Sequence, residues 1–245
     1  MDGRKHGGYQ THFPVPELET VVKLPDNISP DIGCMLPCSA LTTYNAMTAA
    51  KGSIEFGIKS RGQANMLIIG SGGLGCWSVI NARAMHGDKI NIFCADLSQE
   101  KLDLTKDLGA NETILIQKGD SVEQTVALIT EENGTKMDAV LDCVGATHTQ
   151  NVGFFSLHNG GTLVSVGLAG GKLEIPIPTL IGRSISIKGN RVGDIVQLKE
   201  VTKMFSQKGF HKLPPTEYFH LDQANEVLDK LRNGQIAGRA VFKFE

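Results

Sequence analysis

One short stretch constrains the fold of this chain more than any other. Residues 66–75 read M-L-I-I-G-S-G-G-L-G, an apolar run of strand length followed directly by G-x-G-x-x-G and then by a helix-like stretch. Strand, glycine-rich turn and helix in this order form the fingerprint of a dinucleotide-binding unit. Gly70 permits the tight turn, Gly72 lets a pyrophosphate approach the backbone, and Gly75 lets the helix pack against the sheet.

The backbone of this turn is the expected phosphate site. A helix N-terminus offers unpaired N–H groups and about half a positive charge to an anion. We therefore expect Gly72, Gly73 and Leu74 to contact the pyrophosphate through backbone atoms. Glycine-rich turns of this kind also arise from packing alone, so the motif needs a second observation.

A second apolar run supplies that observation, because residues 89–96 (K-I-N-I-F-C-A-D) end in a carboxylate. Asp96 follows the last glycine by about twenty residues, where the fingerprint places the acid that binds the ribose hydroxyls. A 2′-phosphate there would meet like charge, at a cost of roughly 1–4 kcal/mol, and Leu97 adds no cation. This favours NAD over NADP. The alternative is that Asp96 only caps the helix that starts near Ser98.

Strand-like and helix-like segments alternate regularly from Asn65 onward. This rhythm predicts an α/β fold, a parallel sheet with helices on both faces and right-handed crossovers. Six strands with a helix between most of them fit a doubly wound Rossmann sheet. The expected strands are 66–69, 90–95, 112–116, 139–142, 162–166 and 184–188, and the expected helices are 73–85, 99–108, 122–132, 149–157 and 195–207.

The two ends of the chain read differently from its middle. Before residue 30 there are short strand-like pieces broken by prolines, which would be marginal on their own. A helical pattern follows, and Gly52 is its expected stop. The expected elements of these regions are strands over 7–16, 18–25 and 239–244 and helices over 31–51 and 221–232.

Composition excludes several classes of protein. The 245 residues carry a net charge of −2, which gives no reason to expect nucleic acid or an anionic membrane as a partner. The longest apolar runs are strand-sized, so no transmembrane helix is expected. The five cysteines form no C-x-x-C pair, and the chain does not start with a signal peptide. We therefore expect reduced thiols and a cytoplasmic protein.

Several pieces in the same order resemble the zinc-type alcohol dehydrogenases of the medium-chain dehydrogenase/reductase superfamily, over nearly the whole chain. They are G-G-Y-Q-T-H-F-P-V-P-E, V-V-K-L-P-D-N-I-S, C-S-A-L-T-T-Y, the glycine motif, Asp96, D-A-V-L-D-C-V-G, G-G-T-L-V-S-V-G-L, A-N-E-V-L-D-K-L and G-R-A-V. In that family a GroES-like barrel holds the catalytic zinc and a Rossmann domain binds NAD. The resemblance implies an NAD-dependent oxidoreductase that transfers a hydride between an alcohol and the nicotinamide.

The resemblance also implies a domain division. Residues 1–30 resemble only the end of the GroES-like domain, 31–214 the Rossmann domain with its leading helix, and 215–245 the return segment toward the catalytic domain. The start and middle of the barrel are missing, together with its G-H-E segment, a further cysteine and the structural zinc lobe. We therefore expect a fragment, an incomplete gene product or a natural remnant.

Two other functions compete with turnover. The first is a module that binds NAD(H) without catalysis, because most zinc ligands are missing. The second is a methyltransferase that uses the same turn, which fits less well. It leaves Cys38 and the tail unexplained, and no acid directly precedes Gly70.

Single residues match family positions with known roles. Cys38 resembles the last catalytic zinc ligand, although a catalytic zinc needs three protein ligands. Thr42 resembles the threonine beside the nicotinamide, Lys101 the lysine near the adenosine ribose, and Arg239 an arginine that faces the pyrophosphate. The structural alternatives are a free cysteine, a helix hydroxyl bonded to a carbonyl, a solvated lysine and a salt-bridged arginine.

The loops after the last three expected strands complete the site, because ligands of open parallel sheets bind at the carboxyl ends of strands. Core packing and loop geometry are the alternative for all of these residues. They are Cys143 and Val144 beside the adenosine, Val166, Gly167 and Leu168 beside the nicotinamide, and Asn190 and Val192, which resemble the positions whose main chain pairs with the carboxamide.

An apolar, proline-marked region covers Ile175–Ile187. In the family it forms the subunit contact, and an exposed apolar edge otherwise invites aggregation. We therefore expect a homo-oligomer, a dimer through this region. The expected small-molecule partner is an alcohol or aldehyde, whose identity the sequence leaves open.

Overall fold

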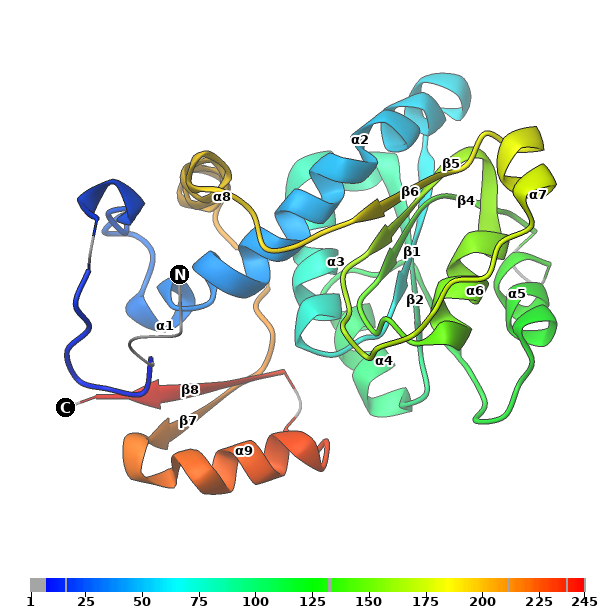
Figure 1. Ribbon diagram of the computed structural model, residues 1–245. Helices are drawn as coiled ribbons and strands as arrows, with labels where there is room; N and C mark the ends of the chain where they lie inside the picture. The colour runs from blue at the N-terminus through cyan, green and yellow to red at the C-terminus, as the bar shows by residue number, and fades with distance from the viewer. Residues whose placement is uncertain (1–7, 16, 132–133, 211, 237, 245) are drawn as a thin grey trace.

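The computed structural model describes residues 8–15, 17–131, 134–210, 212–236 and 238–244. In this part of the chain a six-stranded sheet has helices on both faces, and a separate two-stranded sheet lies beside it (Figure 1). The large sheet is parallel throughout, with the order β3-β2-β1-β4-β5-β6 of a Rossmann fold. The predicted fold class is therefore confirmed. The strands are β1 (Ala64–Ile69), β2 (Ile90–Asp96), β3 (Glu112–Leu115), β4 (Met137–Asp142), β5 (Leu157–Ser165) and β6 (Ser186–Gly189).

Helices cover both faces because side chains alternate along each strand. Met66 and Ile68 of β1 pack with residues of α2, α3, α4 and α8, whereas Leu67 and Ile69 pack with residues of α5, α6 and α7. Burial on both faces is typical of parallel sheets. None of the helices in the described residues is long and apolar enough to cross a membrane. The helices of this part are α2 (Leu41–Arg61), α3 (Gly73–His86), α4 (Gln99–Asp107), α5 (Val122–Thr130), α6 (Thr147–Ser156), α7 (Ile177–Gly182) and α8 (Ile195–Lys208).

The helix expected over 31–51 differs from the prediction. It is preceded by a short helix α1 (Pro30–Gly33) and a π-helical turn (Leu36–Ala40), and α2 continues through Gly52 without a break. The helix ends at Gly62, whose φ of 83° is the left-handed conformation that favours glycine at a helix end. The predicted stop at Gly52 was wrong, since a glycine inside a helix costs only about 1 kcal/mol and the packing of α2 on the sheet offsets it.

The strands expected over 7–16 and 18–25 are also wrong for the residues that the structure describes there. Leu18–Thr20 forms a 3-10 turn, and no strand of either sheet pairs with this segment. Gly7 and Pro16 lie outside the described residues. The segment packs through side chains instead, and the Tyr9 ring lies edge-on to Phe242 with centroids 5.5 Å apart.

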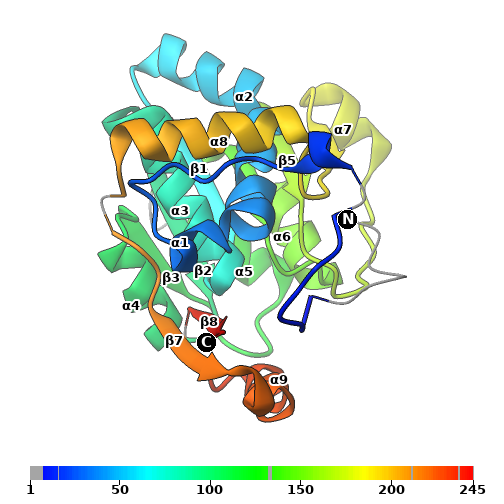
Figure 2. The same ribbon diagram turned by 90° about the vertical axis from the view of Figure 1, so that its left-hand side faces the viewer.

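The second sheet is formed near the C-terminus. The strand β7 (Thr216–His220), which the sequence did not indicate, pairs in parallel with β8 (Arg239–Lys243), and α9 (Ala224–Arg232) connects them. The Tyr218 hydroxyl donates to Asp31 Oδ2 at 2.9 Å, which joins β7 to α1. Figure 2 shows β7, β8 and α9 below the layer of α1, α3 and α8. The division into GroES-like and Rossmann parts stays a prediction.

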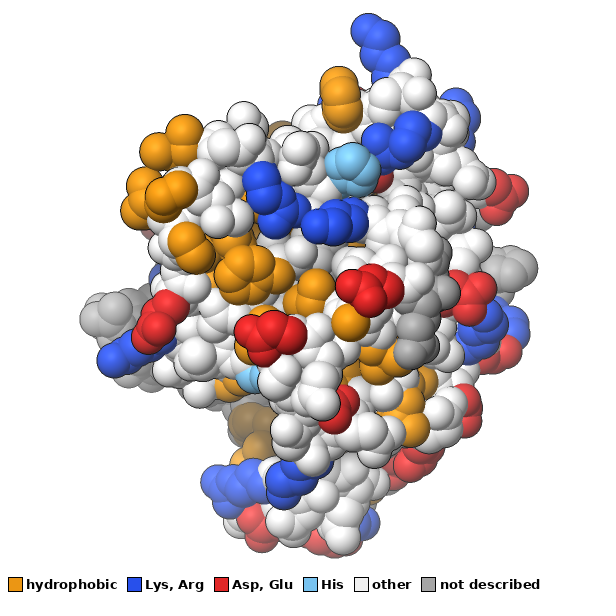
Figure 3. Space-filling view, turned by 90° about the vertical axis from the view of Figure 1, so that its right-hand side faces the viewer, with side chains coloured by type: hydrophobic (Ala, Val, Ile, Leu, Met, Phe, Trp, Pro, Cys, Tyr) orange, Lys and Arg blue, Asp and Glu red, His pale blue; other side chains and the backbone are white. Residues whose placement is uncertain are grey.

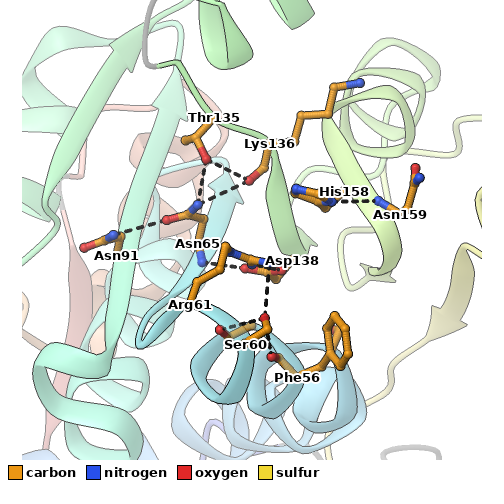
Figure 4. Close-up of polar contacts among 12 residues, drawn as sticks. Phe56, Ser60, Arg61, Asn65, Asn91, Thr135, Lys136, Asp138, His158 and Asn159 are labelled. Carbon is orange, nitrogen blue, oxygen red and sulfur yellow. Dashed lines mark hydrogen bonds and ion pairs between the residues drawn. The ribbon is translucent and has the colours of Figure 1, made fainter.

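A buried polar network holds the amino-terminal end of the large sheet (Figure 4). Asp138 at the start of β4 is 3% exposed and accepts hydrogen bonds from Arg61 Nη2 at 2.5 Å and from the Asn65 backbone N–H at 2.8 Å. Gly57 of α2 leaves room for this carboxylate, because a Cβ there would lie 2.7 Å from Asp138 Oδ2. The network fixes the C-terminal end of α2 to the amino-terminal ends of β1 and β4, opposite the glycine-rich turn.

Candidate nucleotide-binding site

The glycine-rich turn joins β1 to α3 at the carboxyl end of the sheet. Gly70 has a φ of +95°, which other residues rarely adopt. A Cβ on Gly75 would lie 2.1 Å from the Gly70 carbonyl oxygen, so both positions require glycine. Gly72 is the N-cap of α3, and no atom lies within 4 Å of a Cβ built there. The backbone of the turn therefore faces open space at the helix N-terminus.

Arg239 reaches this turn from the second sheet. Its Nη1 lies 2.7 Å from the position of a Cβ on Gly73, the first residue of α3. Among the described residues no carboxylate forms an ion pair with Arg239. The alternative role of Arg239, a surface salt bridge, is therefore not observed among the described residues. A guanidinium without an acidic partner beside a helix N-terminus suits a phosphate group.

Asp96 borders the same turn from the end of β2. Its Oδ2 accepts a hydrogen bond from the Ser71 backbone N–H at 2.7 Å, and its Oδ1 accepts one from the Ser98 backbone N–H at 2.9 Å. A carboxylate has about four acceptor positions, so it can still accept from two ribose hydroxyls. The N-cap of α4 is Ser98, whose Oγ accepts a hydrogen bond from the Lys101 backbone N–H. Lys101 itself is half-buried. Leu97 beside the acid is 62% exposed and adds no cation.

Ser71 adds a group that the sequence reasoning missed. Its side chain is 1% exposed, and its Oγ has no hydrogen-bond partner. A buried hydroxyl without a partner costs about 1–3 kcal/mol. Together with the open backbone at Gly72 and the carboxylate of Asp96, this hydroxyl shows that the residues of the turn fit a polar, phosphate-bearing ligand such as NAD.

Asp142 organises the next loop, and its role was also missed. It ends β4, its side chain is fully buried, and its carboxylate accepts four hydrogen bonds from the following loop and from α6. The D-C-V-G sequence after an apolar strand is the available signal, because a carboxylate at a strand end often receives the next backbone N–H groups. The four donors are the backbone N–H groups of Val144 (2.8 Å) and Gly145 (3.0 Å), the Thr149 hydroxyl (2.8 Å) and the Gln150 amide (2.6 Å).

This loop holds Cys143 and Val144 beside the glycine-rich turn. Val144 Cγ2 lies 2.7 Å from the position of a Cβ on Gly70, and the Cys143 backbone N–H donates to the Ile69 carbonyl at 2.9 Å. Burial raises the pKa of the Cys143 thiol to about 12. The thiol is therefore protonated at neutral pH and acts as a packing group rather than as a nucleophile.

The residues after β5 follow the same edge of the sheet. A Cβ on Gly167 would lie 2.1 Å from the Val144 carbonyl carbon, so the two loops touch through their backbones. Val166 is 7% exposed, whereas Leu168 is 97% exposed. Leu168 thus offers an uncovered apolar surface at the edge where the nicotinamide is expected.

Asn190 and Thr42 meet although they lie far apart in the sequence. Asn190 Nδ2 donates to the Thr42 carbonyl oxygen at 3.0 Å, and Thr42 is 7% exposed near the start of α2. Val192 follows with a φ of +46°, which is unfavourable for a β-branched residue. The sequence indicated each of these residues separately, but not their contact.

Cys38 lies exposed on the π-helical turn before α2. In the part of the chain that the structure describes, no group of three His, Cys, Asp or Glu residues could hold a metal ion. A catalytic zinc needs three protein ligands, so the donor set of these residues does not fit one. Cys38 therefore contributes one ligand at most to a metal site in the described residues.

Comparison with known proteins agrees with this geometry. A family model described as zinc-binding dehydrogenase matches residues 73–207. An alcohol dehydrogenase of Geobacillus stearothermophilus is 32% identical over 98% of this chain and 65% of its own length. An NAD-dependent alcohol dehydrogenase of Sulfolobus acidocaldarius is 32% identical over 97% of this chain and 64% of its own length.

Solved structures give the same result. Acetophenone reductase from Geotrichum candidum, in complex with NAD, superimposes with a TM-score of 0.73 at 27% identity over 91% of this chain and 58% of that one. The chain spans slightly less than two-thirds of the length of the curated relatives named above, 65% and 64%. The match to the family model covers more than half of the chain, over the α/β sheet described above. The chain therefore belongs to the zinc-binding dehydrogenase family.

Proposed function

We propose that this chain binds NAD(H) and is the nucleotide-binding part of an alcohol dehydrogenase-type oxidoreductase that acts on a small alcohol or aldehyde. One juxtaposition carries the proposal: Arg239 without an acidic partner and the Asp96 carboxylate both border the open backbone of the glycine-rich turn. A cation for the pyrophosphate and an acid for the ribose thus both lie next to one helix N-terminus. The NAD-dependent relative supports the choice of nucleotide.

In this proposal the residues of the chain bind and orient the nucleotide. The backbone of Gly72–Leu74 and the Arg239 guanidinium hold the pyrophosphate, and Asp96 accepts from the adenosine ribose. Cys143 and Val144 border the adenosine, and the loops after β5 and β6 surround the nicotinamide. When bound, the nicotinamide supplies the hydride chemistry, and the chain supplies its position.

Binding without turnover is the second candidate, favoured by a specific observation. The described residues bring no three metal ligands together. Metal analysis of purified protein separates the candidates, because less than about a tenth of a zinc ion per chain would rule out a metal-dependent reaction here. Formation of NADH from NAD and a panel of alcohols in the same preparation would rule out the second candidate, a chain that binds NAD(H) without catalysis.

A fluorescence titration with NADH tests binding directly. We expect a saturable change in emission, and no response at millimolar NADH would contradict the proposal. Arg239→Ala should weaken binding about tenfold to a hundredfold, because a charge-assisted hydrogen bond contributes roughly 1.5–3 kcal/mol. Arg232→Ala is the matched control, since Arg232 lies on α9 and pairs with Asp229 at 2.8 Å. An equal loss in both variants would argue against a phosphate contact.

We also propose a homodimer through residues 175–187. One of the two edge strands of the large sheet is β6, and Ile177 and Ile181 of α7, the helix directly before it in the chain, are 57% and 71% exposed. Figure 3, which views the molecule from the side of α7, shows hydrophobic side chains grouped on this surface. Light scattering after size exclusion should give the mass of a dimer, and Ile181→Glu should give a monomer. Leu231→Glu on α9, 47% exposed, is the control that should leave the mass unchanged.

A cytoplasmic location is a further part of the proposal. All five cysteines are free, which fits the reducing cytosol. Fractionation of cells that express the chain from its native gene would test it.

A further inference from the structure

The loop between β6 and α8 (residues 190–194) is held against α2 from both ends. At its start, Asn190 Nδ2 donates to the Thr42 carbonyl oxygen at 3.0 Å. Beyond its end, Gln197 Nε2 donates to Asn45 Oδ1 at 2.8 Å. Between them, a Cβ on Gly193 would lie 2.7 Å from Leu41 Cδ1, so the loop backbone lies directly against α2.

The backbone of this loop is strained and carries unused polar groups. Val192 has a φ of +46°, a conformation that persists only where the surroundings impose it. The backbone N–H groups of Arg191, Val192 and Gly193 donate to no described residue, whereas the Asn190 N–H still bonds to Ser165 in the ladder of β5 and β6. The loop therefore presents free amide donors immediately beyond the end of β6.

The Asn190 side chain explains how this arrangement persists. A helical carbonyl has a second lone pair, so Thr42 can accept from Asn190 without giving up its bond within α2. This hydrogen bond fixes the position of the strained loop next to Thr42, the residue expected beside the nicotinamide. The backbone at Val192 cannot relax to negative φ without moving Asn190 or Gly193, which both contact α2.

We infer that Asn190 is a positioning residue, whose side chain holds the free amide groups of residues 191–193 in the geometry that binds the nicotinamide carboxamide. This inference rests on the proposed function and deepens it. It assigns a role to the Asn190 side chain, in addition to the main-chain role that the family resemblance implies. The role concerns the nicotinamide end of the ligand alone.

The test compares two ligands that differ at that end. NADH carries the nicotinamide, whereas ADP-ribose lacks it but has the same pyrophosphate and adenosine. Calorimetric titration of Asn190→Ala should show NADH affinity reduced about tenfold, the effect of one lost hydrogen bond, and ADP-ribose affinity within about twofold of wild type. Asn190→Asp keeps the side-chain shape but lacks the amide donor. If the alanine variant folds poorly, the aspartate variant should show the same loss of NADH affinity with an unchanged ADP-ribose affinity.

Asn27→Ala is the matched control. The Asn27 amide also donates to a backbone carbonyl distant in the sequence, that of Ser206 at 2.8 Å, near the end of α8 opposite the loop. It should leave both affinities unchanged. Unchanged NADH affinity in the Asn190 variants, or an equal loss of affinity for both ligands, would overturn this inference but not the proposed function. Wild-type protein that binds neither ligand would overturn the proposed function and this inference with it.

Discussion

Asp96 shows how a single carboxylate is oriented before any ligand binds. One oxygen is fixed by the Ser71 N–H of the glycine-rich turn and the other by the Ser98 N–H. Because backbone groups hold both oxygens, little side-chain freedom remains to be lost on binding. In the proposed function this residue links the turn to the ribose position, and we expect its negative charge to set the preference between NAD and NADP.

Asp96→Ala should weaken NAD binding and narrow the preference for NAD over NADP by about tenfold or more, because like-charge repulsion of roughly 1–4 kcal/mol with the 2′-phosphate is removed. Paired titrations with NADH and NADPH measure the ratio. Asp103→Ala on α4 is the control, since the Asp103 carboxylate accepts from Gln99 Nε2 at 2.7 Å and from no other described side chain. An unchanged ratio in Asp96→Ala would contradict the assigned role.

The cysteines differ in reactivity for a reason that lies in their burial. Burial raises the pKa of Cys76 to about 11 and those of Cys94 and Cys143 to about 12. At pH 8 a thiol with a pKa of 12 is ionised in about one molecule in ten thousand, and only the thiolate reacts. Cys34 and Cys38 are exposed to reagent, and burial of part of the Cys34 side chain also raises the pKa of that thiol.

Iodoacetamide at pH 8 should therefore label Cys34 and Cys38 in the native protein well before the other three cysteines. Peptide mass spectrometry gives the site of each adduct, and protein unfolded in urea, in which all five should react, is the control. Fast labelling of Cys143 in the folded protein would show that the loop after β4 opens more readily than its hydrogen bonds imply.

At the scale of an element, α2 is fixed at both of its ends. Its first turns contact the loop after β6 through Thr42 and Asn190, and its last residue pairs with the buried Asp138. Its length is therefore decided by these contacts and not by Gly52 within it. The same helix carries Thr42 near its start, and the π-helical turn with Cys38 directly precedes it, so the position of α2 matters for the candidate site.

Arg61→Ala should lower the free energy of unfolding by about 2–3 kcal/mol, because it leaves the carboxylate of Asp138 buried without its cation. Urea unfolding measures the change. Lys51→Ala on the same helix is the control, since Lys51 and Glu55 form an exposed pair at 3.6 Å that contributes about 0.3–0.5 kcal/mol. Equal effects in the two variants would contradict the role given to the buried pair.

At the scale of the whole molecule, the proposed nucleotide site lies between two sheets. The glycine-rich turn belongs to the six-stranded sheet, and Arg239 belongs to β8 of the two-stranded sheet. A pyrophosphate that contacts both would add a connection between them. Ligand binding should therefore stabilise the molecule as a unit.

At a concentration of about 100 times its dissociation constant, NADH should stabilise the folded state by about 2.7 kcal/mol and raise the melting temperature by roughly 5–10 °C. Differential scanning fluorimetry measures the shift. Asp96→Ala, tested at the same concentration, should show a smaller one. A wild-type melting temperature that does not move with saturating NADH would contradict binding to the folded state.

Local patterns alone predicted the α/β alternation, the succession along the chain of the strands and helices of the large sheet, and the glycine-rich turn. These features follow from the periodicity of apolar residues and from the backbone freedom of glycine at positions such as Gly70 and Gly75, which neighbouring residues set. The family resemblance then indicated Thr42, Asn190 and Arg239 one by one.

Long-range packing decided the rest. It carried α2 past Gly52, left residues 18–25 without a strand partner, and paired β7 with β8. It also brought Arg239 to Gly73 and Asn190 to Thr42, contacts between segments more than a hundred residues apart in the sequence. Sequence by itself determined the alternating strands and helices of the large sheet and its glycine-rich turn, because those preferences are local. Only the tertiary structure decided which side chains meet around the turn, because each such contact depends on the placement of whole elements.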